Sequence, residues 1–414
     1  SSPTTKSTTT TTTSTSMQSS SIISDGICQM MGSTTDSIQL WNQNIHQILN
    51  ATLEHVPSAY SNDQELITQD EFHLFRIWVQ QMMMQYMTPR RLLKSVKQLP
   101  TDDHVKRIIG ILEKRKRWFD NQRQKRKMGK NQHMNQNENH KRKIEYEDDN
   151  ENEDKHQKDE KEPPPLRILV MGGSVTKGHF CYDNPITKHV IDSTACNWSK
   201  RLGLIINQLL GFKAVQIFNY SAGGTSSNVG SLQYKFKILF PNNLLPQPDI
   251  VINAYSTNDM HVVSRERRPS NSSPDQSIKL GATSSFRVDG LEDKIHEINE
   301  DFIRSVLYTN PCQSPPLLIY LSDYFGNFIK DVKDTMIFNT VLDQLTSYYD
   351  VMYVSYADAM RDIVLRDDTE YWFSPKWILD DGNPTAQIHP GMGGHIAIMW
   401  VILFNFIHSM SNYC

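Results

Sequence analysis

From residue 165 onward, the chain alternates short, continuous apolar runs with longer stretches in which apolar residues recur at helical spacing. The apolar runs lie at residues 166–171, 215–219, 250–254, 317–321 and 351–355. Continuous apolar strands separated by helices are typical of a parallel sheet that is covered on both faces. The pattern therefore predicts an α/β domain over residues 165–414, with a three-layer α/β/α arrangement and a five-stranded parallel sheet.

The residues before this domain are unevenly composed, and they explain why only 38% of the chain is hydrophobic. Residues 1–21 include 17 Ser or Thr residues, so we expect 1–37 to form a disordered Ser/Thr-rich tail. Residues 38–120 carry apolar residues at helical spacing, which predicts a helical extension. Residues 121–164 are basic and then acidic, without an apolar face, which predicts a charged disordered linker.

Charge and hydropathy narrow the classes of partner. The basic residues of 123–143 are offset by the acidic residues of 145–154, and the net charge of the chain is −3. We therefore expect no nucleic-acid partner, and a nuclear role for the basic stretch is the weaker alternative. No uninterrupted run of apolar residues reaches the length of about 18 that a spanning helix needs. We expect no transmembrane segment within this chain and a buried helix at 393–408.

Polar residues and glycines follow the predicted strands at the points where the strands end. Ser174 follows the first strand, Gly224 the second and Asn258 the third, and His389 precedes the last helix. The carboxyl ends of parallel strands meet at one edge of the sheet, so we expect these residues to lie close together. A Ser hydroxyl becomes a nucleophile when a His accepts its proton, which assigns Ser174 and His389 to these roles. Backbone N–H groups of Ser174 and Gly224 and the Asn258 amide would bind the oxyanion.

These residues stand in four blocks that resemble those of the SGNH (GDSL-type) hydrolase superfamily. The blocks are Gly172-Gly173-Ser174, Asn219 to Gly224, Asn258-Asp259, and His389-Pro390 with Gly394-His395. The resemblance covers about residues 165–410 and none of residues 1–160. It implies the flavodoxin-like SGNH fold and a serine esterase that works through an acyl-enzyme. It also implies a broad substrate range of short acyl esters, lipids or O-acetyl groups on carbohydrate.

The chain departs from the family pattern at two positions. Gly173 replaces the Asp of the usual Gly-Asp-Ser block, and we expect little effect on the chemistry. Ala386 stands three residues before His389, where the family carries the triad Asp. Asp381 is assigned as the third catalytic residue on proximity alone, with Asp380 as the alternative. Otherwise a backbone carbonyl orients His389, or the protein is a weak or inactive enzyme, since loss of a triad Asp costs on the order of 10⁴ in rate.

Other histidines lie in the same strand-end segments without forming a recognisable metal signature. His179, His189 and His261 have no zinc-ligand spacing, and His395 on the last helix is interpreted as a buried structural residue. We therefore expect no metal and no cofactor.

Cysteines and glycosylation sequons indicate in which cellular compartment the protein is expected. A disulfide between Cys181 and Cys196 would close a 16-residue segment beside the nucleophile and contribute about 3 kcal/mol. Cys312 and Cys414 would form a second pair, and the alternative is five free thiols in a reducing compartment. Four sequons occur, at Asn50, Asn197, Asn219 and Asn271, and Asn271 is the expected glycan site. Together with the Ser/Thr-rich tail, these features favour the secretory pathway, Golgi or extracellular space over the cytoplasm.

The function that fits these observations is hydrolysis of carboxylic esters by a serine esterase, including acetyl esters of carbohydrate. The expected partner is a small ester or an acylated glycan or lipid. An O-acetyltransferase would use the same nucleophile. A non-catalytic SGNH-like binding protein would keep the pocket without the chemistry.

Overall fold

The structure is a computed structural model of the 414-residue chain. It describes residues 37–54, 77, 79–81, 83–140, 161–179, 181, 197–236, 247–260, 290–309, 314–323, 329–364, 389–390 and 392–414. The predicted Ser/Thr-rich tail therefore lies almost entirely outside the described residues, as do 141–160 of the predicted linker.

A six-stranded sheet organises the molecule, with the strand order β1-β6-β5-β4-β2-β3. Five strands are parallel and follow the predicted runs: β2 (Leu166–Gly172), β3 (Val215–Asn219), β4 (Ile250–Ala254), β5 (Leu317–Ser322) and β6 (Met352–Ser355). The predicted α/β class is confirmed, because helices cover both faces of this parallel sheet.

The predicted number of strands was too low by one. The sixth strand, β1 (Val96–Gln98), comes from the predicted helical extension and pairs antiparallel with β6 at the edge of the sheet. It has only three residues, which is too short for the alternation that marks a strand in a sequence. The predicted extension therefore contributes to the central sheet.

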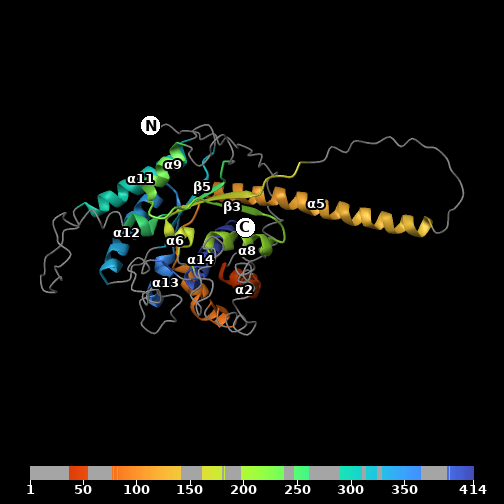
Figure 1. Ribbon diagram of the computed structural model, residues 1–414, viewed down its shortest axis with the longest axis horizontal. Helices are drawn as coiled ribbons and strands as arrows, with labels where there is room; N and C mark the ends of the chain where they lie inside the picture. The colour runs from red at the N-terminus through yellow and green to blue at the C-terminus, as the bar shows by residue number, and fades with distance from the viewer. Residues whose placement is uncertain are drawn as a thin grey trace, which may run out of the picture.

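Two groups of helices cover the two faces of the sheet (Figure 1). One face packs against α2 (Ser37–Glu54), α8 (Trp198–Leu210) and α14 (Met392–Tyr413), in the core cluster that also holds Ile168 and Val170 of β2. The other packs against α9 (Ser227–Lys235), α11 (Leu291–Tyr308) and α12 (Ile329–Tyr348), in the cluster that holds Leu169 and Met171. Neighbouring side chains of β2 thus point to opposite faces, as a strand requires.

The N-terminal helices share their core with the C-terminal helix. The Trp41 ring of α2 lies edge-on to Trp400 and Phe404 of α14, at centroid distances of 5.5 and 5.3 Å. The Trp400 indole donates a hydrogen bond of 3.0 Å to Thr52 on α2. Since Trp41 and Trp400 are fully buried, α2 forms part of the main hydrophobic core.

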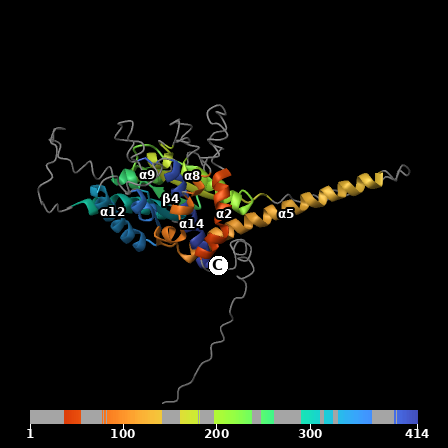
Figure 2. The same ribbon diagram turned by 90° about the horizontal axis from the view of Figure 1, so that it is seen from below.

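Helix α5 (Asp102–His140) begins in the core and continues away from it (Figures 1 and 2). Val105, Ile108 and Leu112 of its first turns are buried, whereas the side chains from Arg123 to Met128 are almost all exposed. The structure thus makes residues 121–140 helical, where the sequence predicted the first half of a disordered linker. Lys, Arg and Gln favour helix even without an apolar face, which accounts for the difference.

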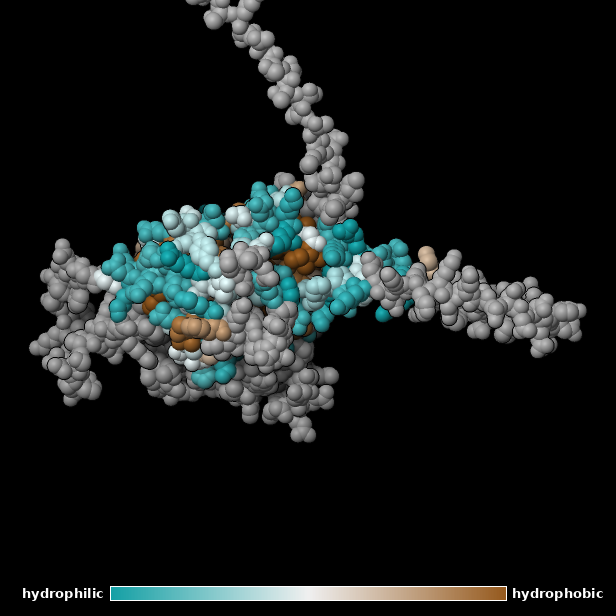
Figure 3. Space-filling view, turned by 90° about the horizontal axis from the view of Figure 1, so that it is seen from above, coloured by the Kyte–Doolittle hydropathy of each residue, from teal (hydrophilic) through white to brown (hydrophobic). Residues whose placement is uncertain are grey.

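Helix α14 has the length and apolar composition of a membrane-spanning helix over residues 393–413. In this structure, 89% of that apolar window is buried inside the fold. A core helix of a globular domain has the same composition, and α14 packs against α2, α5 and α8. The face of the molecule in Figure 3 is mostly hydrophilic, with separate brown patches.

Candidate active site

Ser174 stands at the start of a short helix that follows β2. The strand ends at Gly172, and Ser174 is the first residue of α6 (Ser174–Lys177). A Cβ at residue 172 would lie 2.7 Å from the carbonyl oxygen of Ala254 and against the side chain of Thr176. Only glycine allows this close approach of β2 and β4 just before the serine. The turn places the Ser174 hydroxyl at the carboxyl edge of the sheet.

His389 meets Ser174 across 215 residues of sequence. Its Nε2 atom lies 2.7 Å from Ser174 Oγ, and its side chain is 4% exposed. A buried imidazole at this distance is placed to accept the hydroxyl proton. The His179 ring lies edge-on to His389 at a centroid distance of 5.0 Å, and burial, followed by the charge of Lys177, lowers the pKa of His179.

The predicted third member of the triad is outside the described part of the chain. Asp380, Asp381 and Ala386 all fall in residues 365–388. The assignment of Asp381, and the choice between it, Asp380 and a backbone carbonyl, therefore stay predictions.

The second predicted block forms a loop beside the nucleophile. The Ala222 N–H donates to the carbonyl of Gly172 at 3.0 Å, which ties the loop to the end of β2. A Cβ at Gly223 would stand 3.8 Å from the Cβ of Ser174. Gly224 has a φ of 76°, a backbone conformation that favours glycine. The loop therefore brings Gly224 to the region of Ser174.

The Asn258 side chain lies against the residue that precedes the nucleophile. A Cβ on Gly173 would stand 2.9 Å from Asn258 Nδ2 and would overlap Asn258 Oδ1 and Cγ. The side-chain amide of Asn258 therefore occupies the space that a side chain at 173 would need. The structure thus brings Ser174, His389, Gly224 and Asn258 together at one edge of the sheet.

Two buried aspartates, which the sequence analysis did not assign, lie behind these loops. Asp259 accepts hydrogen bonds of 2.7 Å from both the N–H and the hydroxyl of Ser227, at the start of α9. Asp323 follows β5 and accepts hydrogen bonds from residues 256 and 257. Burial raises the pKa of Asp259 to about 7 and that of Asp323 to about 6. Asp323 directly follows β5, and Asp259 lies in the turn after β4, so their places near the ends of buried strands are the sequence signal that could have found them.

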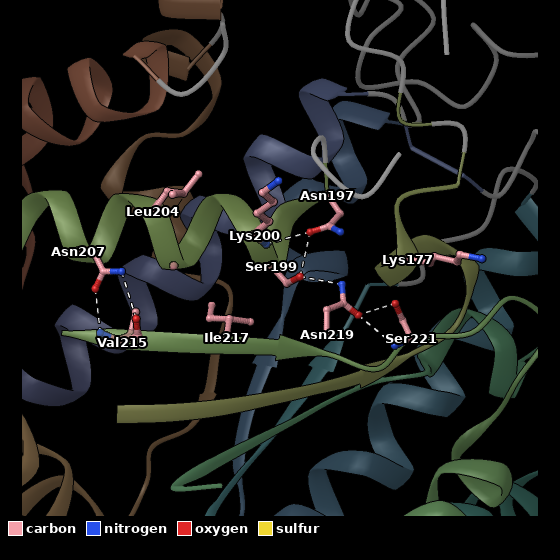
Figure 4. Close-up of a pocket in the computed structure, with 11 residues that line it drawn as sticks. Lys177, Asn197, Ser199, Lys200, Leu204, Asn207, Val215, Ile217, Asn219 and Ser221 are labelled. Carbon is pink, nitrogen blue, oxygen red and sulfur yellow. Dashed lines mark hydrogen bonds between the residues drawn. The ribbon is translucent and has the colours of Figure 1, made fainter. Parts of the chain in front are cut away.

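A pocket of about 490 Å³ lies beside the site, between α8 and the edge strand β3 (Figure 4). Its lining residues do not include Ser174 or His389. Its polar side chains bond to one another: Asn219 Nδ2 donates to Ser199 Oγ at 2.8 Å and to the carbonyl of Thr176 at 3.2 Å. These bonds join β3, α6 and α8, so we interpret the network as structural support for the helix that carries Ser174.

The same network affects two of the four sequons. The Asn197 side chain is 3% exposed, and its Oδ1 caps α8 by accepting from the N–H of Lys200 at 2.9 Å. The Asn219 amide is occupied by the bonds just described. Asn197 is thus buried, whereas Asn219 is exposed at the end of β3 with its amide held by hydrogen bonds, and Asn271 lies outside the described residues.

Cys181 is buried, disulfide-bonded and held close to the nucleophile helix by its N–H bond to the carbonyl of Gly178 at 2.9 Å. Cys414 is also disulfide-bonded. Cys196 and Cys312 lie outside the described residues. The pairings Cys181–Cys196 and Cys312–Cys414 therefore stay predictions.

The histidine near the end of the fourth block is enclosed by the core. His395 is fully buried on α14, and neither ring nitrogen has a hydrogen-bond partner within the described ranges. Burial, then Arg201, then His389 lower the pKa of His395 to about 3, so the ring is neutral at physiological pH. Across the same ranges, no three His, Cys, Asp or Glu residues are grouped to hold a metal ion.

Comparisons with known proteins were made by sequence family, by curated sequence and by structure. No family model and no curated protein matches the chain. Among solved structures, the chain is similar to LAE5, an α/β hydrolase from the metagenome of Lake Arreo, Spain, at 10% identity and a TM-score of 0.39, over 58% of this chain and 94% of that one.

Two further similarities are to esterases. One is a two-domain esterase (CEX) active on acetylated mannans, at 14% identity and a TM-score of 0.36, over 59% of this chain and 50% of that one. The other is a catalytic mutant of Axe2, an acetylxylan esterase from Geobacillus stearothermophilus, at 11% identity and a TM-score of 0.37, over 58% and 94%. At these identities and scores we draw no conclusion about activity from them.

Proposed function

We propose that this chain, whose α/β fold and strand-end motifs resemble those of SGNH hydrolases, is a serine esterase that hydrolyses carboxylic esters. The observation that carries the proposal is the distance of 2.7 Å between His389 Nε2 and Ser174 Oγ. The two residues are 215 positions apart, and His389 is buried, so the contact is specified by the fold and not by local chain proximity.

The reaction would proceed in two steps. His389 takes the hydroxyl proton while Ser174 Oγ attacks the ester carbonyl, and a tetrahedral intermediate forms. The N–H groups of Ser174 and Gly224 and the Asn258 amide bind the oxygen as it gains negative charge. His389 then gives its proton to the leaving alcohol, and the acyl group stays on Ser174. A water molecule, activated by His389, releases the acid and restores the serine.

We assign the orientation of His389 to Asp381. A carboxylate that accepts the Nδ1 proton would hold the ring in the tautomer whose Nε2 accepts the serine proton. Asp380 and a backbone carbonyl are the alternatives. Asp381→Asn is expected to lower kcat by about 10²- to 10⁴-fold if the assignment holds, and Asp380→Asn is the matched comparison.

The proposed substrates are small acyl esters, with acetyl esters of carbohydrate first among them. The proposed location is the secretory pathway, Golgi or extracellular space. Disulfides persist in oxidising compartments, and the disulfide-bonded state of Cys181 and Cys414 supports this location.

Hydrolysis of 4-nitrophenyl acetate and release of acetate from acetylated xylan and mannan by the full chain test this function. Ser174→Ala is expected to lower kcat by about 10³-fold or more, because the nucleophile is removed. Thr340→Ala, at an exposed hydroxyl on α12, is the control and should retain full activity. Ester hydrolysis that survives in Ser174→Ala would refute the proposal. A wild-type chain that hydrolyses none of these esters would also refute it. Transfer of acetate to a sugar acceptor in preference to water would instead identify an O-acetyltransferase.

A further inference from the structure

The turn that presents Asn258 is held from the neighbouring strand. Residues 256–260 form one helical turn after β4, and Asp323 stands directly after β5, the next strand in the sheet. Asp323 Oδ1 accepts hydrogen bonds from the Ser256 hydroxyl, from the Thr257 N–H at 3.3 Å and from the Thr257 hydroxyl at 3.0 Å. Its own N–H donates to Ser256 Oγ at 2.9 Å. Four hydrogen bonds thus connect one residue to the two residues that precede Asn258.

These bonds lie in a water-excluded part of the fold. Asp323 is 5% exposed, and Ser256 and Thr257 are each 3% exposed. Hydrogen bonds to an ionised carboxylate are stronger than those between neutral groups, and they gain strength where the dielectric is low. The bond to the Thr257 N–H fixes the peptide plane at the start of the turn, and the two hydroxyl bonds fix its side chains. Because Asn258 is the next residue, these bonds also restrict the position of its Cα.

Asp259, the other buried aspartate, has a different task. It accepts from Ser227 on α9 and therefore anchors the helix that follows the Gly224 loop. Asp259 itself lies in the Asn258 turn, so its bonds to Ser227 tie that turn to α9, whereas Asp323 holds the two residues before Asn258 from the end of β5. The Asn258 amide, packed against Gly173, then lies in one place relative to Ser174.

We propose that Asp323 is a positioning residue for the oxyanion site, which fixes the Ser256–Thr257 turn so that the Asn258 amide faces the reacting carbonyl. The inference rests on the proposed esterase function for its effect on rate. Its structural part, the fixing of the turn, is independent of that function. Because the oxyanion forms only in the transition state, a displaced amide lowers kcat and leaves KM nearly unchanged.

The test compares Asp323→Ala, Asp323→Asn and Ser256→Ala in the full chain. Asp323→Ala removes every acceptor and is expected to lower kcat by about 10- to 10²-fold, below the loss from deleting an oxyanion donor outright. Asp323→Asn keeps the size of the side chain and an oxygen acceptor, and it should recover most of that loss. Ser256→Ala removes two of the four hydrogen bonds and leaves the two to Thr257, so it should give an intermediate value. Thr346→Val, which removes a buried hydroxyl bond on α12, is the control for a loss of stability alone.

Amide hydrogen exchange in residues 253–260 is the second measurement, and it does not require activity. Asp323→Ala should accelerate exchange there, while Thr346→Val should not. Unchanged exchange in this segment together with an unchanged kcat per folded molecule would overturn the proposal. If Asp323→Ala does not fold, the other two variants, Asp323→Asn and Ser256→Ala, test the proposal. A kcat and an amide exchange rate equal to those of the wild type in both variants would overturn it. A wild-type chain without esterase activity would refute the proposed function, and the exchange result would still decide whether Asp323 fixes the turn.

Discussion

At the scale of single residues, Gly173 and Asn258 share one space. From the sequence alone, Gly173 is a minor departure from the Gly-Asp-Ser block, with little expected effect on the chemistry. In the structure, a side chain at 173 would occupy the position of the Asn258 amide. In this chain, the glycine is therefore the residue that allows Asn258 to approach the nucleophile.

Gly173→Ala is expected to lower kcat by about 10- to 10²-fold, because the added methyl group displaces Asn258, the proposed oxyanion donor. The melting temperature should change little, since the atoms displaced are the end of one side chain. Gly110→Ala on α5 is the matched control, because a Cβ there meets nothing within 4 Å. Steady-state kinetics and thermal unfolding of both variants would check this, and a wild-type kcat in Gly173→Ala would contradict the assigned role of Asn258.

The residues of the site differed in how far the sequence could locate them. Ser174, Gly224, Asn258 and His389 each follow a strand or precede a helix, so fold topology alone predicts that they meet. The role of Asp323 was missed, since its partners are 66 and 67 residues away and depend on side-chain geometry. Asp381 lies outside the described residues, and its place beside His389 stays a prediction.

At the scale of elements, the helices before residue 141 divide into a packed part and a projecting part. Helix α2 and strand β1 complete the core and the sheet, whereas the second half of α5 extends beyond both (Figure 2). The apolar periodicity of 38–112 predicted helices but did not show which elements they pack against. Helix α2 packs against α8 and against the C-terminal helix α14, where Thr52 accepts a hydrogen bond from Trp400, 348 residues further along the chain.

Trp41→Ala is expected to lower the free energy of unfolding by about 3–5 kcal/mol, because it leaves a large cavity between α2 and α14. Met128→Ala, at a side chain 66% exposed on α5, should change it by less than about 0.5 kcal/mol. Urea unfolding followed by fluorescence and by esterase activity measures both. An unchanged midpoint for Trp41→Ala would show that α2 is not part of the core.

At the scale of the whole molecule, the chain is an α/β fold with a sixth strand and several helices drawn from a segment that precedes the predicted domain. The apolar runs predicted the parallel strands because β2, β4, β5 and β6 are covered on both faces and are therefore apolar along their length. The edge strand β3 is partly exposed. The projecting end of α5 was missed because its polar composition has no apolar periodicity, although its residues favour helix.

The proposed function requires that Ser174 is a nucleophile activated by His389. Intact-mass analysis of the full chain after treatment with a fluorophosphonate tests it most directly, because this reagent reacts with activated serine hydroxyls. We expect one adduct on the wild-type chain, located at Ser174, and none on Ser174→Ala. In His389→Gln, labelling should slow by about 10²-fold or more. An adduct of equal yield on Ser174→Ala, or a wild-type labelling rate in His389→Gln, would contradict it.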